Sequence, residues 1–320
     1  MTSHKRPVGI LFENIVKVKS ILSEFEKRKI PFVKINVLQH QYNPAEFNAP
    51  FSLVVNLTGL SASSRANSQW IFHTANYLAH LERIGVPVIN GVNADSVENS
   101  RSKQLSLFAK LNLRFPKTRI VNHISQFVPA SLSLKFPVLI KVNTESSGIK
   151  AKKFYSIRGL EDAVSLNQLS LGVDHTALVQ EYLHPADNRI VRVETLDGRF
   201  LYGLKIHEHL LQKDFKDPYG YAIENFNGVR KMRPDIEPYV PPKEIVRDIE
   251  RIVDEAKINV GAVEYLTDTL YEQIWFLGIS SLSNLSIVES ESQYFNPQKW
   301  FVDYVEQRLQ RVQHAEQIYA

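Results

Sequence analysis

The sequence contains no cysteine, and this absence removes several classes of protein at once. Folds held by disulfides, metal centres built on thiolates and enzymes with a cysteine nucleophile are all excluded. Any metal ion would therefore be bound through oxygen or imidazole ligands.

Long apolar runs and long basic runs are also missing. No stretch approaches the roughly 18 uninterrupted apolar residues that a membrane-spanning helix needs. The polar residues 1–7 lack the apolar core of a signal peptide. Lys and Arg are spread along the chain, and a net charge of +4 is small for 320 residues, so nucleic acid is not expected as the main ligand. We expect a cytoplasmic protein without a membrane or nucleic-acid partner.

What is present suits a full globular protein. A chain of 320 residues is long enough to bury a sizeable core in two or three packed layers. Hydrophobic residues make up 44% and charged residues 22%, so disorder is not expected. No internal repeat and no low-complexity tract interrupts the chain.

The first ninety residues alternate between two patterns. Short apolar runs predict strands at 8–12, 32–37, 53–57 and 86–91, whereas helical spacing of apolar residues predicts helices at 16–28 and 70–83. Strands that alternate with helices favour an open parallel α/β sheet, whose ligands usually bind beyond the carboxyl ends of the strands.

The pattern changes after Gly91, where strands come in succession as in an α+β fold. The Asp197-Gly198 dipeptide predicts a hairpin between two of them. We expect strands at 136–142, 177–183, 190–196, 200–206, 260–266 and 274–279, and helices at 100–111, 160–169, 243–257 and after Pro297.

Two lysines stand out by their placement. Lys103 opens a predicted helix, and Lys141 ends an otherwise apolar strand. A buried ammonium group needs an anion, and phosphate is one candidate. The alternative is that Lys141 reaches solvent or pairs with Glu181, which the spacing supports equally well.

Two short segments near these lysines suit a nucleotide site. Ser146, Ser147 and Gly148 follow the Lys141 strand, and small residues let backbone N–H groups approach phosphate oxygens, although a plain β-turn has the same composition. The stretch 180–183 (QEYL) ends a strand, and an exposed backbone edge can pair with the polar face of adenine. By itself it also suits an ordinary strand end.

The order of these pieces resembles the ATP-grasp superfamily, in particular the glutamate-adding and glutathione-synthetase-like carboxylate–amine ligases. No single motif is decisive, but the order and spacing are specific and cover most of the chain. The matching segments are 77–82 (YLAHLE), 85–91 (GVPVING), 102–103 (SK), 115–118 (FPKT), 136–141 (FPVLIK), 147–148 (SG), 180–183 (QEYL), 192–194 (RVE), 261–265 (GAVEY) and 282–284 (LSN).

The resemblance implies an ATP-grasp fold in three parts: an N-terminal parallel-sheet domain at 1–92, a lid subdomain at 93–179 and a C-terminal subdomain at 180–320. It implies ATP as cofactor, with Mg²⁺ bridging the phosphates during phosphoryl transfer to a carboxylate. An amine then attacks the acyl phosphate. The substrates would be small-molecule or peptide carboxylates and amines.

The resemblance also implies roles for individual residues. Lys103 and Lys141 would contact the phosphates under a loop of Ser146, Ser147 and Gly148. Adenine would be held beside Gln180, Glu181, Tyr182 and Leu183, through the backbones of Glu181 and Leu183. Asp187 would bind the ribose, Arg192 and Lys205 would face the acyl phosphate, and Glu264 would bind metal.

The last predicted strand departs from the family pattern. Relatives carry an acid, one spacer and an asparagine there, and these residues bind both ions. This chain aligns without a gap and has Gly278 and Ser280 at those positions, so that Glu264 alone remains of three expected ligands. Because Gly278 has no side-chain oxygen and a serine hydroxyl is a poor ligand for Mg²⁺, metal binding should be weakened.

Three hypotheses follow. The first is an active ligase in which Glu264 rebuilds a metal site with Asp268, Glu289 or Glu291. The second is a catalytically degenerate homologue that acts as a nucleotide-binding, regulatory or scaffold protein. The third is unrelated small-molecule or peptide binding, since fold alone does not fix function.

Two further features stay open. His207 and His209 alternate on a predicted strand, so their imidazoles would share a face and could bind a transition metal or act as acid and base. A solvated or hydrogen-bonded pair is the more common arrangement. The oligomeric state is also open, with a homodimer as one expectation because similar proteins often dimerise.

Overall fold

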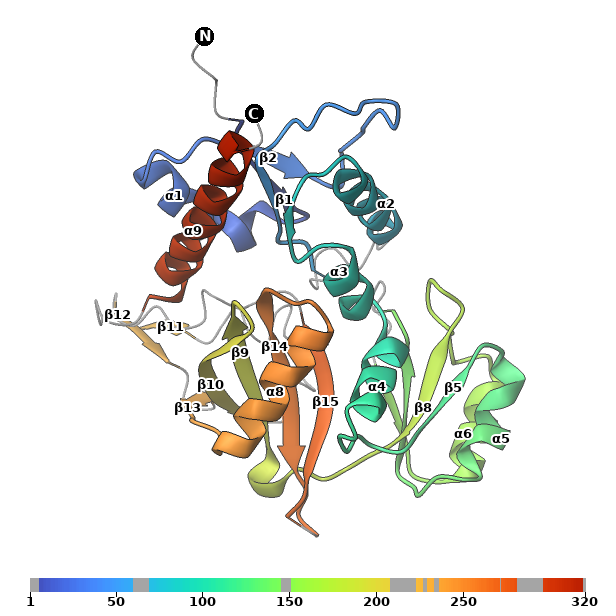
Figure 1. Cartoon of the computed structure of the whole chain (residues 1–320). Helices are drawn as coiled ribbons and strands as arrows, with labels where there is room; N and C mark the ends of the chain where they lie inside the picture. The colour runs from blue at the N-terminus through green and yellow to red at the C-terminus, as the bar shows by residue number, and fades with distance from the viewer. Residues whose placement is uncertain are drawn as a thin grey trace.

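The computed structural model describes residues 6–59, 69–144, 151–207, 223–226, 229–232, 236–270, 272–280 and 296–318. Within them the strands form one parallel and two antiparallel sheets, together with a two-stranded hairpin of β11 (Ile223–Phe226) and β12 (Val229–Met232) (Figure 1). None of the described helices is long and apolar enough to cross a membrane.

The N-terminal sheet is parallel throughout, with the order β2-β1-β3-β4. Its strands are β1 (Val8–Phe12), β2 (Phe32–Asn36), β3 (Leu53–Asn56) and β4 (Val88–Ile89). β1 and β3 are buried along their whole lengths because helices cover both faces of the sheet, as is usual for parallel strands.

Three helices cover this sheet. α1 (Ile15–Lys27), which begins at the N-cap Asn14, and α9 (Pro297–Ile318) pack together into one core with β1 and β3. α2 (Trp70–Arg83) belongs to the core on the other side. Figure 1 shows α9 returning beside α1 and the N-terminal strands. The terminal helix therefore packs on the N-terminal sheet, although in sequence it belongs to the segment 180–320.

The second sheet is antiparallel and has the order β5-β8-β6-β7. It consists of β5 (Thr118–Val121), β6 (Val138–Val142), β7 (Lys152–Phe154) and β8 (Ala177–Glu181). The helices α5 (Phe127–Ser131) and α6 (Ile157–Ser165) share its core. In this sheet β6 and β8, which carry predicted nucleotide contacts, are antiparallel neighbours, so that Lys141 lies opposite Leu178 and Gln180 lies opposite Leu139.

The third sheet is also antiparallel and has the order β13-β10-β9-β14-β15. Asp197 and Gly198 make the predicted tight turn, with φ angles of 52° and 71°. α3 (Val92–Glu98), α4 (Arg101–Lys110) and α8 (Lys243–Glu255) pack into its core. Its strands are β9 (Arg189–Leu196), β10 (Arg199–His207), β13 (Ile236–Pro238), β14 (Val260–Thr267) and β15 (Ile274–Ser280).

The expected α/β organisation with a parallel N-terminal sheet is confirmed, as is the β-rich later part. The short helix α3 was not expected from the sequence. At seven residues it is too short to show a helical repeat of apolar side chains.

Candidate functional site

Lys141 and Gln180 meet at the centre of the second sheet. Lys141 lies on β6 and donates from Nζ to Gln180 Oε1 on β8, at 2.8 Å. Gln180 in turn donates from Nε2 to Thr118 Oγ1 on β5, at 2.9 Å. Gln180 is a neutral amide, so this contact differs from the pairing with Glu181 that was the alternative interpretation of the sequence. The carboxylate of Glu181 instead accepts the backbone N–H of Lys135, at 2.9 Å.

The backbone after Gln180 leaves the sheet with free polar groups. The N–H of Glu181 bonds to Lys117 O and that of Tyr182 bonds to Pro137 O, both at 2.9 Å. In the described part of the chain, no hydrogen bond reaches the carbonyl of Glu181 or the N–H of Leu183. These two groups are one acceptor and one donor at the edge of β8, which is the pairing that an adenine edge requires.

Aromatic and cationic side chains surround this edge. Lys153 Nζ lies 3.2 Å from the centroid of the Tyr182 ring, and the rings of Tyr182 and His184 pack edge to face at 4.7 Å. Lys153 is on β7, beside the Lys141 strand. No sequence pattern singles out Lys153, because only the pairing of β7 with β6 brings it to Tyr182.

Lys103 lies in the first turn of α4, where the N-cap Ser100 accepts its backbone N–H. Its ammonium group donates to Ser96 on α3 and lies near Asp95. Asp95 is buried, and burial raises its pKa to about 6, against the opposing effects of the Asn99 and Asn56 amides and Lys103.

Arg192 lies inside a buried ion-pair network of the third sheet. Its Nε donates to Glu194 at 2.7 Å and its Nη1 donates to Glu264 on the neighbouring strand β14 at 2.9 Å. The side chains of Arg192 and Glu194 are only 3% and 0% exposed, whereas Glu264 is 23% exposed. The guanidinium thus neutralises the carboxylate that was expected to bind metal.

The register of β15 bears directly on the predicted metal site. Gly278 is paired with Glu264 across β14 and β15, so an acid at position 278 would lie beside Glu264, with Cβ atoms about 5 Å apart. Among the described residues, a Cβ at Gly278 would meet only Gln104 Oε1, at 3.6 Å, so a side chain fits beside them. Ser280 points its hydroxyl to Glu98 on α3, at 3.5 Å.

Gln104 on α4 is a residue that sequence reasoning missed. Its amide bonds both backbone groups of Ile279 on the edge strand β15: Nε2 donates to the carbonyl at 3.0 Å and Oε1 accepts the N–H at 3.1 Å. This contact fixes α4, and with it Lys103, against the strand that carries Gly278 and Ser280. No sequence signal marks it, since the two partners are 175 positions apart.

The described residues do not fit a magnesium site. No group of three His, Asp or Glu side chains among them converges to hold a metal ion. Asp268 follows Glu264 by four residues, about 13 Å along an extended strand. Its carboxylate accepts the indole N–H of Trp275 at 2.9 Å. Glu289 and Glu291, the other expected partners, lie outside the described residues.

The remaining candidates are scattered. Asp187 is exposed, in a left-handed conformation (φ 54°). Lys205 lies on β10 with Nζ 4.5 Å from the centroid of the Tyr239 ring. His207 ends β10, while Ser146, Ser147, Gly148, His209 and residues 282–284 lie outside the part that the structure describes.

Similarity to known proteins is found in the structure and not in the sequence. No protein-family model and no curated protein matches the sequence. A RimK-domain ATP-grasp protein of Sphaerobacter thermophilus is 16% identical, with a TM-score of 0.67 over 93% of this chain and 98% of its own. D-alanyl-alanine synthetase A of Vibrio cholerae is 12% identical, with a TM-score of 0.66 over 97% and 99% of the two chains.

A third similar structure was solved with its ligands. A RiPP-associated ATP-grasp ligase of Chryseobacterium gregarium, in complex with ADP and a leader and core peptide, is 11% identical, with a TM-score of 0.62 over 94% of this chain and 97% of its own. At such identities the likeness establishes the fold. The chain has the ATP-grasp fold over nearly its whole length.

Proposed function

From the ATP-grasp fold we infer that this protein binds ATP beside β8 and uses it to join a carboxylate to an amine through an acyl phosphate. The similar structures include a D-alanyl-alanine synthetase and a ligase in complex with a peptide. We therefore propose small-molecule or peptide carboxylates and amines as substrates. A cytoplasmic location and a homodimer are part of the same proposal.

The observation that carries this proposal is the end of β8. In the described part of the chain, it combines a carbonyl of Glu181 and an N–H of Leu183 that no hydrogen bond reaches with Lys141 on the adjacent strand β6, whose ammonium group donates to the Gln180 amide. The backbone pair suits the polar edge of adenine, while Lys141 suits the phosphates. Because the chain continues from this segment through a short turn into β9, we propose that a bound nucleotide would lie near the strand that carries Arg192.

The chain's own residues account for binding and charge compensation. Lys141 and Lys103 would offset phosphate charge, and in the proposed reaction Arg192, whose charge Glu194 and Glu264 already balance, would lie near the transferred group. Mg²⁺ is implied by the fold, but the described residues do not provide its site, so we assign no step to it. The proposed rate enhancement rests on positioning and fixed positive charge.

A second candidate function is nucleotide binding without ligation. One observation favours it: Gly278 lies directly opposite Glu264, and Arg192 bonds that carboxylate. With no acid at 278 and Ser280 turned to Glu98, the strand lacks the oxygens that a two-metal reaction needs. Such a protein would use bound ATP as a regulatory or scaffolding signal.

Calorimetric titration with ATP, with and without Mg²⁺, tests both functions. Magnesium-dependent binding together with ADP release in the presence of carboxylate and amine substrates supports the ligase. Equal binding with and without Mg²⁺, without ADP release, supports the second candidate. Absence of ATP binding would sink both.

A reverse substitution tests the strand alignment. Gly278→Glu combined with Ser280→Asn should make ATP binding depend on Mg²⁺, because the new acid would lie beside Glu264. Gly278→Ala is the matched control, since it adds a Cβ to the same space without a ligand oxygen. If the double variant gains no more Mg²⁺ dependence than the control, the proposed alignment is wrong.

A further inference from the structure

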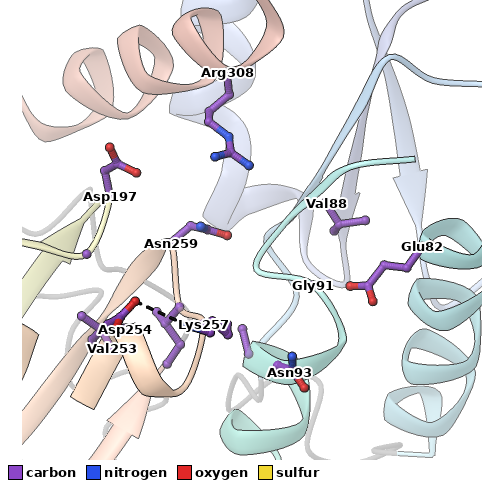
Figure 2. Close-up of a pocket in the computed structure, with 13 residues that line it drawn as sticks. Glu82, Val88, Gly91, Asn93, Asp197, Val253, Asp254, Lys257, Asn259 and Arg308 are labelled. Carbon is purple, nitrogen blue, oxygen red and sulfur yellow. Dashed lines mark hydrogen bonds and ion pairs between the residues drawn. The ribbon is translucent and has the colours of Figure 1, made fainter. Parts of the chain in front are cut away.

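A polar cavity of about 280 Å³ lies where three parts of the fold meet, away from Lys141 and Gln180 (Figure 2). α2 and the start of α3 form one wall. The β9–β10 turn, the end of α8 and the loop that joins α8 to β14 form another, and α9 closes the cavity. None of the residues that line it belongs to the proposed nucleotide site.

Arg308 on α9 is the unusual residue of this cavity. It lines the cavity and is partly buried, and Figure 2 shows its guanidinium directed into the space between the walls. In the described part of the chain it has no hydrogen bond and no ion pair. Arg28, which packs against the same helix, is by contrast saturated by Glu24, Asp303 and Glu306 at 2.6 to 2.8 Å. A partly buried guanidinium with all its donors free is suited to a carboxylate or phosphate.

Amide groups add donors beside Arg308. Asn259 uses its Oδ1 to accept the backbone N–H of Asn90, which leaves its Nδ2 without a described partner. Figure 2 shows the Asn259 amide near Arg308, at the edge of the same space. Because Asn90 holds one end of this amide, its orientation is fixed before any ligand arrives.

The opposite wall is acidic. Glu82 on α2 accepts the backbone N–H of Val92 through Oε1, at 2.9 Å, and only the absence of a side chain at Gly91 lets it pack there, since a Cβ would lie 2.2 Å from Oε1. Its Oε2 has no described partner. Lys257 and Asp254 pair with each other at 3.5 Å and cancel. Besides that pair, the cavity is lined by the cation of Arg308 and by two carboxylates, those of Glu82 and Asp197.

The charge balance decides the class of ligand. Three acids (Glu82, Asp197 and Asp254) face two bases (Lys257 and Arg308), so a polyanion such as a nucleotide would be repelled on one side. We propose that this cavity binds a small zwitterion of the amino-acid class, with its carboxylate at Arg308 and the Asn259 amide and its ammonium group at Glu82. A ligand bound there would bridge α2, the loop before β14 and α9, and so stabilise the contact between the N-terminal and third sheets.

The test uses the full-length chain and the twenty standard amino acids, first by thermal shift and then by calorimetry. At least one amino acid should bind, and its N-acetyl and carboxamide derivatives should bind at least about tenfold more weakly, because each lacks one of the two charges. Failure of every amino acid to bind overturns the proposal. So does equal binding of the N-acetyl derivative or of inorganic phosphate, which would indicate a site for anions alone.

Four variants separate this cavity from a substrate site near β8. Arg308→Gln and Glu82→Gln should each weaken amino-acid binding at least about tenfold. Both should fold, since Arg308 has no described ion pair to lose and glutamine can still accept the N–H of Val92. Arg311→Gln, one turn away and outside the cavity, and Lys141→Ala should bind as the natural chain does. If Arg308→Gln binds the amino acid as tightly as the natural chain does, the amino acid binds elsewhere and the inference is refuted, whatever the outcome of the ATP titrations.

Discussion

Replacement of Asn90 should destabilise the junction between the N-terminal sheet and the third sheet. Its side chain is fully buried after β4, at the junction between them. Nδ2 donates to Val260 O at 2.7 Å, and Oδ1 accepts the N–H groups of Asn259 and Val260 at 2.9 and 3.2 Å. Asn259 returns a bond from its own Oδ1 to Asn90 N, at 2.9 Å. Asn90→Ala removes the three side-chain bonds and leaves their backbone partners unsatisfied.

The expected magnitude follows from these contacts. The two bonds to Val260 are buried and the bond to Asn259 is partly buried. At about 1 to 1.5 kcal/mol each, the three amount to about 3 to 4.5 kcal/mol of lost stability. Asn90 also has a left-handed backbone with φ 56°, which costs alanine about 1 kcal/mol more. Asn90→Gly loses the same bonds without that strain, so its effect should be about 1 kcal/mol smaller.

Urea unfolding followed by tryptophan fluorescence measures these effects, because Trp70 reports on the N-terminal sheet and Trp275 on the third sheet. Asn112→Ala is the matched control: Asn112 has the same φ of 56° but is exposed and makes no described side-chain hydrogen bond. If Asn90→Ala costs no more stability than Asn112→Ala, the reasoning about the junction is refuted.

Three further predictions concern the nucleotide site, the terminal helix and a buried acid. Lys141→Ala should weaken ATP binding at least about tenfold in calorimetry, whereas Lys110→Ala should not; equal affinities would contradict the phosphate assignment. Phe301→Ala, at a fully buried position of α9, should lower the free energy of unfolding by about 3 to 5 kcal/mol in urea, and a loss below about 1 kcal/mol would mean that α9 does not form part of the N-terminal core. Burial raises the pKa of Asp95 from 3.8 to about 6, so the folded state binds this proton more tightly than the unfolded chain does. The free energy of unfolding should therefore fall by up to about 3 kcal/mol as the pH rises from about 4 to about 6. This pH-dependent loss should be absent from Asp95→Asn.

The nucleotide contacts show how far a sequence can be interpreted. Lys141 and Gln180 were both identified from their places at strand ends, which are local features. Their mutual hydrogen bond was not, because it depends on β6 and β8 being neighbours in the sheet. The register of these strands puts Gln180, and not Glu181, on the same face of the sheet as Lys141.

For β15, the strand expected to carry metal ligands, the sequence and the structure provide different information. The sequence identified Gly278 and Ser280 as departures because their spacing could be aligned with a known pattern. The sequence could not show that Arg192 bonds Glu264, that Ser280 turns to Glu98 or that Gln104 pins Ile279. Each of these contacts joins positions far apart in the chain, and a shift of one residue in register would turn the strand's side chains to the other face.

The sequence by itself determined the order of strands and helices, the parallel N-terminal sheet and the strand ends that suit a nucleotide, because periodicity and turn chemistry act over a few residues. Tertiary structure alone decided that α9 returns to the first sheet, that Arg192 neutralises Glu264 and that Arg308 faces a cavity with no described counter-ion. These features form only when distant segments of the chain pack together. The free energy of burying these groups therefore depends on the complete fold and not on the local sequence.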